Sequence, residues 1–175
     1  MARTKTTKQS LLAELARHVL ANGLNTASLR PMAAAANTSD RMLIYHFGSK
    51  DGLIAALLEY LADEMAKGLE TALPPKTFAT ERELVETIVG LLRSPDFKPY
   101  SRIWLDIVSA AAQGNTSHQA AGHAVIQMFL DWVAVRHPDG MDGAPFALTF
   151  IEGTLIMDAV GHGAVTESGL RGMKS

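Results

Sequence analysis

The segment Ser28–Leu53 constrains the fold of this chain most strongly, because it reads as two short helices joined by a tight turn. The hydroxyl of Ser28 is expected to cap the first of these helices. Asn37 suits the left-handed backbone conformation that ends many helices, and Thr38 or Ser39 can cap the helix that follows. The sequence therefore predicts a helix-turn-helix motif.

The second of these helices, about residues 39–47, has too little apolar surface to be buried throughout. Leu43, Ile44 and Phe47 are expected to pack inward. The opposite face is left for solvent or for a partner, and a helix of this kind fits the major groove of DNA. The side chains expected on that face are Asp40, Arg41, Met42, Tyr45 and His46.

The end of this helix carries a recognisable motif. Residues 45–47 are a Tyr-His-Phe cluster, and Ser49, Lys50 and Leu53 follow it without a gap. With this spacing the segment resembles the N-terminal domain of TetR-family transcriptional regulators, over about residues 11–61. The resemblance implies an all-α protein that binds DNA as a homodimer.

The exposed side chains of the second helix are expected to divide the work of DNA recognition. Arg41 is the first choice for base readout, because its guanidinium can make paired contacts to guanine. Met42, Tyr45 and His46 are expected to touch thymine methyl groups or the DNA backbone, with ordinary packing as the alternative for Tyr45. Asp40 is expected to cap the helix or to repel phosphate rather than to bind it.

Other residues of the motif are expected to hold phosphate groups. Ser28 and Arg30 begin one helix and Lys50 begins another, so side chains and free amides can grip the DNA backbone there. Lys5 and Lys8 either reach a neighbouring groove or belong to a frayed end. The full set of predicted DNA-binding residues is Ser28, Arg30, Ser39, Asp40, Arg41, Met42, Tyr45, His46 and Lys50.

Charge is distributed unevenly along the chain. Residues 1–50 hold seven basic and two acidic side chains, a net charge of +5, whereas residues 51–175 hold nine basic and sixteen acidic ones, a net charge of −7. A polyanion such as DNA would therefore be attracted to the N-terminal part only.

Hydrophobic residues recur with a helical period almost everywhere, which predicts an all-α fold. We expect an N-terminal three-helix helix-turn-helix DNA-binding domain at residues 1–49 and a C-terminal helical ligand-binding and dimerisation domain at residues 50–175. Helices outside the motif are predicted at about residues 7–22, 49–70, 81–93, 100–113, 117–136 and 144–163.

The last two predicted helices, residues 117–136 and 144–163, are apolar on more than one side. One face can meet the core of the subunit and the other a second copy, so these helices are predicted to form a homodimer interface by two-fold symmetry. Gly153 and Gly161 are expected to allow close approach between helices. The alternative is that both faces are buried within one subunit.

The C-terminal half offers candidates for an apolar effector pocket, although the same residue types are also common in cores. The candidate ligand-binding residues are Trp104, Ile107, Met128, Phe129, Trp132, Phe150 and Glu152. The carboxylates of Asp106 and Glu152 need partners, and an Arg across the dimer is expected to supply one. No cofactor is predicted, and the spacing of the histidines predicts no metal site.

Together with these features, the resemblance implies a repressor that binds a palindromic operator and is released by a small-molecule effector. An activator remains open, and so do two alternatives without DNA binding, a helical protein-interaction module and a small helical enzyme. An enzyme is disfavoured because the sequence contains no nucleophile-elbow, zinc-protease or phosphate-loop motif. The N-terminus lacks a secretory signal and no long apolar run is present, so a cytoplasmic location is expected.

Overall fold

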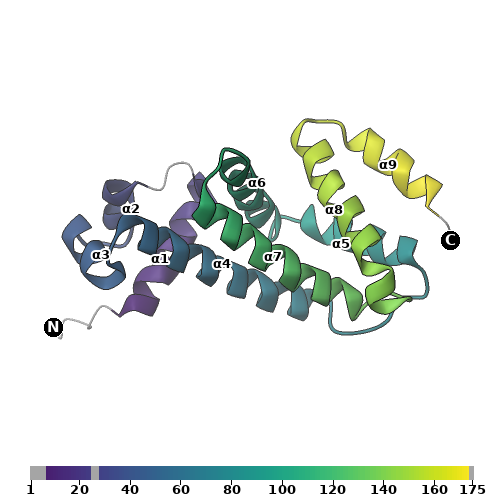
Figure 1. The fold of residues 1–175 in the computed structure, drawn as a ribbon, viewed down its shortest axis with the longest axis horizontal. Helices are drawn as coiled ribbons and strands as arrows, with labels where there is room; N and C mark the ends of the chain where they lie inside the picture. Colours follow the sequence, from purple (N-terminus) through teal and green to yellow (C-terminus); the bar gives the residue numbers. More distant parts are fainter. Residues whose placement is uncertain (1–6, 25–27, 174–175) are drawn as a thin grey trace. The chain divides into compact units, whose positions relative to one another are not determined.

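The computed structural model describes residues 7–24 and 28–173, and Lys5 of the predicted basic arm lies outside them. Within these residues every regular element is a helix, which confirms the predicted all-α fold (Figure 1). In chain order the elements are α1 (Lys8–Asn22), α2 (Leu29–Ala35), α3 (Asp40–Phe47), α4 (Lys50–Ala72), α5 (Glu81–Leu92), α6 (Lys98–Ala112), α7 (Thr116–Ala134), the 3₁₀-helix η2 (Gly140–Asp142), α8 (Ala144–Ala159) and α9 (Gly163–Gly172).

The chain forms two compact units. Unit 1 consists of the residues up to Ala66 together with Arg102–Gly122, and unit 2 consists of Lys67–Ser101 together with the residues from His123 onward. Helices α4, α6 and α7 contribute residues to both units. The functional boundary predicted between residues 49 and 50 stays a prediction.

Unit 1 is organised around α1. Thr7 and Ser10 form a reciprocal capping box at its start, and Gly23, at φ 89°, ends it. Leucine and valine at helical spacing on α1 are buried, and α1 packs on α2, which packs on α3. The buried apolar side chains of this unit are Leu11, Leu15, Ala16, Val19, Leu24, Met32, Ala33, Leu43, Leu53, Leu57, Leu58, Leu61, Ile103 and Ile107.

Two side chains of α6 hold the end of α1. Arg102 donates a hydrogen bond to the carbonyl of Leu20, and Asp106 accepts one from the backbone N–H of Leu24 at 2.9 Å. Asp106 therefore has a partner within its own unit, a backbone amide, and the Arg expected across a dimer stays a prediction. We call this pair of contacts the α6 clasp.

In unit 2, α8 packs against α5 and α9 (Figure 1). Arg93, at the end of α5, donates to both carboxylate oxygens of Asp158 at 2.7 and 2.9 Å and to Glu167 at 2.7 Å. These hydrogen bonds raise the pKa of Arg93 further above its usual range. The guanidinium thus joins three helices.

The final predicted helix, residues 144–163, is wrong in its extent, because α8 ends at Ala159 and a separate helix, α9, follows. Gly161 has φ 79° and donates to the carbonyl of Asp158 at 3.1 Å, while His162 donates to that of Met157 at 2.7 Å. This pattern closes a helix with a left-handed residue. Gly161 therefore ends α8 rather than allowing two helices to approach each other.

Arg136, which is only 1% exposed, ties together the ends of α4 and α7. Its guanidinium donates to the carbonyls of Leu73 at 2.6 and 3.1 Å and of Trp132 at 2.9 Å, and to the carboxylate of Glu70 at 2.6 Å. These carbonyls lie at helix ends, where backbone acceptors have no partner in the helix. One buried cation thus satisfies both ends and a carboxylate.

Replacing Arg136 with Met should lower the free energy of unfolding by about 2–4 kcal/mol, because buried carbonyls lose their donors. Urea unfolding followed by circular dichroism measures this. The control is Arg82→Met: Arg82 is paired with Glu86 at 2.8 Å on the surface of α5, and its loss should cost less than about 1 kcal/mol. Equal losses in the two variants would contradict the buried role of Arg136.

Candidate nucleic-acid interface

The turn between α2 and α3 is fixed by backbone hydrogen bonds. Asn37 has φ 48° and donates to the carbonyl of Ala34 at 3.1 Å, and Thr38 donates to that of Ala33 at 2.9 Å. This pattern confirms the left-handed helix end predicted at Asn37. Ser28 occupies the N-cap position of α2, but its hydroxyl accepts no capping hydrogen bond, so the predicted side-chain cap there is wrong.

Helix α3 is anchored by one side and capped by a hydroxyl. Ser39, rather than Thr38, is the N-cap and accepts from the backbone N–H of Met42 at 3.3 Å. Asp40 lies in the first turn, where its negative charge interacts favourably with the positive end of the helix dipole. Leu43 is fully buried and fixes which face of α3 packs inward.

The opposite face of α3 is open. Tyr45 is 78% exposed and Met42 is 40% exposed, and Arg41 is exposed beside them. His46 is half-buried and meets the ring of Tyr45 edge-on, with ring centroids 5.3 Å apart. The large side chains on this face, one of them cationic, therefore project from a short helix whose inner face is held in place.

The junction between α3 and α4 is tighter than the sequence suggests. Gly48, at φ 81°, ends α3, and the hydroxyl of Ser49 accepts from the N–H of Gly52 at 3.0 Å. A Cβ at Gly52 would lie 2.4 Å from the carbonyl oxygen of Phe47, so only glycine fits there. Sequence reasoning missed Gly52, although a glycine in the first turn of a Leu-rich helix is a signal of close backbone approach.

Cationic side chains without partners flank α3. Among the described residues, none forms an ion pair with Arg30, Arg41 or Lys50, and all three are exposed. By contrast Arg17 is paired with Glu14 at 2.5 Å, and this hydrogen bond lowers the pKa of Glu14. Cationic charge that no described carboxylate neutralises is thus present on α3 and on the first turns of α2 and α4.

The structure places the predicted ligand residues in two units. Trp104 and Ile107 lie on α6 in unit 1, next to Gly122 of α7. In unit 2, the rings of Phe129 and Trp132 lie 5.5 Å apart. The remaining members of that unit are Met128, Phe150 and Glu152.

Within unit 2, these residues have different surroundings. The indole N–H of Trp132 donates to Glu70 at 2.8 Å, and the guanidinium of Arg136 lies 4.0 Å from its ring. Phe150 lines a pocket of about 430 Å³ together with Phe146, Glu81 and residues of α9. This open pocket is a candidate effector site.

Metal-binding clusters and membrane-spanning helices are both absent from the described ranges, residues 7–24 and 28–173. These ranges contain no group of three or more His, Cys, Asp or Glu side chains placed to hold a metal ion. They also contain no helix of sufficient length and apolar character to cross a membrane.

Comparison with known proteins identifies the N-terminal motif. Residues 7–57 match the family model described as bacterial regulatory proteins, tetR family. No curated protein matches the chain in sequence.

Solved structures share the fold over nearly the whole chain. A proposed transcriptional regulator from Streptomyces coelicolor A3(2) is 19% identical, with a TM-score of 0.71 and coverage of 93% of this chain and 94% of that one. A TetR transcriptional regulator from Legionella pneumophila is 18% identical, with a TM-score of 0.63 and coverage of 97% and 96%. The multidrug binding protein EbrR, complexed with imidazole, is 17% identical, with a TM-score of 0.63 and coverage of 95% and 94%.

Replacing Gly52 with Ala should destabilise the α3–α4 junction by about 1–3 kcal/mol, because the new methyl group must displace the carbonyl of Phe47. Thermal unfolding measures the loss, and amide chemical shifts of α3 should change with it. Gly90 is the matched control, since it lies within α5 and has open space around it. Alanine there should leave stability unchanged or raise it by up to about 1 kcal/mol; a stable Gly52→Ala variant with unchanged α3 shifts would refute the argument.

Proposed function

We propose that this chain, whose residues 7–57 belong to the tetR family of bacterial regulatory proteins, is a non-enzymatic transcriptional regulator that reads DNA with α3. The observation that carries the proposal is the exposed face of α3, where Arg41, Met42 and Tyr45 project from a helix held by buried Leu43. Arg30 and Lys50, which form no ion pair with a described residue, stand before and after α3 in the chain. This combination suits base contacts in a major groove between phosphate contacts on either side.

The residues divide by role. Arg41 recognises guanine through its two-pronged guanidinium, and Met42, Tyr45 and His46 contact thymine methyl groups or the backbone. The phosphate groups are held by Ser28, Arg30, Ser39 and Lys50, which position the protein on the DNA. The carboxylate of Asp40 repels phosphate and so excludes a DNA backbone that comes close to it. In a homodimer, two copies of α3 about 34 Å apart would meet successive major grooves of a palindromic operator.

The Arg41→Ala variant tests base readout. Its affinity for operator DNA should fall about tenfold or more, since a paired Arg–guanine contact contributes about 1–3 kcal/mol of discrimination. Fluorescence anisotropy measures binding to the chain's own upstream DNA, or to a site selected from random duplex DNA, against a scrambled duplex. Lys50→Ala should instead weaken binding to both duplexes and lower the salt slope by about one.

Arg82→Ala is the control for these measurements, because Arg82 is a surface cation of unit 2. It should leave operator affinity and salt slope unchanged. If the wild-type chain enriches no sequence from random DNA, the DNA-reading proposal fails. Salt-insensitive binding to a protein would then favour the interaction-module alternative.

Dimerisation is proposed through α8. Phe146, Ile156 and Val160 are 61%, 50% and 63% exposed and lie on one helical stripe with Thr149 and Gly153. A Cβ at Gly153 would meet no atom within 4 Å, so this stripe is bare at its middle and allows a second helix to come close. We call these five residues the α8 stripe. A two-fold axis across it would bury the same apolar patch of both copies.

Replacing Ile156 with Glu should raise the dimer dissociation constant about a hundredfold or more, because the two-fold axis brings a carboxylate from each copy into the same apolar contact. Analytical ultracentrifugation over a concentration series measures this. Val135, 57% exposed outside the α8 stripe, is the matched site, and Val135→Glu should leave dimerisation unchanged. A dimer insensitive to Ile156→Glu would move the interface elsewhere.

Effector control completes the proposal. The pocket beside Phe150 and Phe146 is apolar with one carboxylate, that of Glu81, which suits an aromatic or cationic compound. The fold is shared with a multidrug binding protein, which supports a small-molecule effector here. In this scheme the chain is a cytoplasmic repressor. The effector binds better to a conformer in which the two copies of α3 are no longer spaced to reach successive major grooves, and the operator is released.

A further inference from the structure

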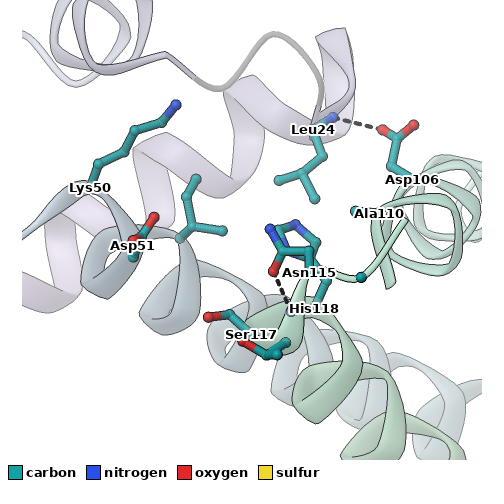
Figure 2. Close-up of a pocket in the computed structure, with 11 residues that line it drawn as sticks. Leu24, Lys50, Asp51, Asp106, Ala110, Asn115, Ser117 and His118 are labelled. Atoms are coloured by element: carbon teal, nitrogen blue, oxygen red, sulfur yellow. Dashed lines mark hydrogen bonds between the residues drawn. The ribbon is translucent and has the colours of Figure 1, made fainter. Parts of the chain in front are cut away.

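Unit 1 contains an open pocket of about 510 Å³, lined in part by the start of α4, which follows α3 directly in the chain (Figure 2). The first turn of α4 and the second half of α6 line it, together with the first turn of α7. Leu24, Ile54 and Ala110 provide apolar surface, and most of the other lining side chains are polar. Volume and composition fit a small polar molecule.

Two of the polar groups in the wall are already used. Asp106 accepts from the N–H of Leu24 at 2.9 Å as part of the α6 clasp. The Oδ1 of Asn115 accepts from the N–H of His118 at 3.0 Å and so caps α7 (Figure 2). These hydrogen bonds set the shape of the pocket and are not available to a ligand.

Other groups remain available. The Nδ1 atom of His118 is buried without a hydrogen-bond partner among the described residues. The ammonium of Lys50 has no ion-pair partner there either. The hydroxyls of Thr116 and Ser117 lie in the same wall, and the carboxylate of Asp51 can accept from a ligand hydroxyl.

We propose that this pocket binds a small hydroxylated organic anion, a carboxylate or a phosphate ester, held by Lys50 and His118. Lys50 supplies the charge, the Nδ1 of His118 gains a partner and donates to the anion when it carries the proton, and Asp51 selects ligands that carry hydroxyl groups. The site differs from the apolar pocket beside Phe150 in unit 2 in both its unit and its chemistry.

A second consequence rests on the proposed DNA-reading function. Lys50 is also a predicted phosphate contact, so an anion bound to it competes with the DNA backbone for the same charge. By linkage, DNA and the anion each weaken the binding of the other by the same factor.

L-malate and glycerol 3-phosphate are the probes, titrated into the full chain at constant ionic strength and followed by amide chemical shifts. We expect at least one to shift the amides of residues 115–118 in a saturable way. Lys50→Gln and His118→Ala should each weaken that binding about tenfold. Lys98, the exposed first residue of α6, is the matched control, and Lys98→Gln should leave it unchanged.

The absence of saturable shifts with both probes overturns the site, and so does equal binding by Lys50→Gln and wild type. The malate and glycerol 3-phosphate arms separate a carboxylate ligand from a phosphate ester. A third arm measures operator affinity with and without the bound probe, relative to each variant's own ligand-free value. An unchanged affinity overturns only the competition with DNA, and a chain that binds no DNA overturns the proposed function while the titration still tests the pocket.

Discussion

The structure of unit 1 depends on the close approach of Gly52 to the backbone of Phe47. A Cβ added to Gly52 would lie 2.4 Å from the carbonyl oxygen of Phe47. Gly48 turns the chain there and Ser49 begins the next helix with its hydroxyl, so α3 and α4 are joined by a junction with little freedom. The direction in which Arg41 and Tyr45 project depends on that junction. A rigid connection of this kind lowers the ordering cost of binding.

The α6 clasp extends this rigid region beyond the motif. Arg102 and Asp106 hold the last turn of α1 from a helix about eighty residues later in the sequence, through the carbonyl of Leu20 and the N–H of Leu24. Because both contacts are to backbone, they hold the position of the helix end rather than one side chain. The α6 clasp thus links α6 to the end of α1, and α1 packs on α2, which in turn packs on α3.

The sequence was sufficient for the parts of this fold that depend on local chemistry. Asn37, Ser39 and the Leu stripe of α4 predicted the helix-turn-helix, because helix ends and apolar spacing are set within a few residues. It was not sufficient where long-range contacts decide. The partner of Asp106 lies 82 positions away, and Gly161 could serve either as a close-packing residue or as a helix end until the backbone was known. The DNA contacts, the effector residues and the dimer interface remain predictions.

The uneven charge of the chain is best understood residue by residue. Arg17, Arg93 and Arg136 each bind a carboxylate of the same chain within 3 Å, so their charge is already neutralised in the folded protein. Arg30, Arg41 and Lys50 are exposed, and no described residue pairs with them. A cation that is already paired must lose its partner before it can bind phosphate, whereas an unpaired one loses only water and counterions. For the proposed DNA contacts, the net charge of the first fifty residues is therefore expected to matter less than these three side chains.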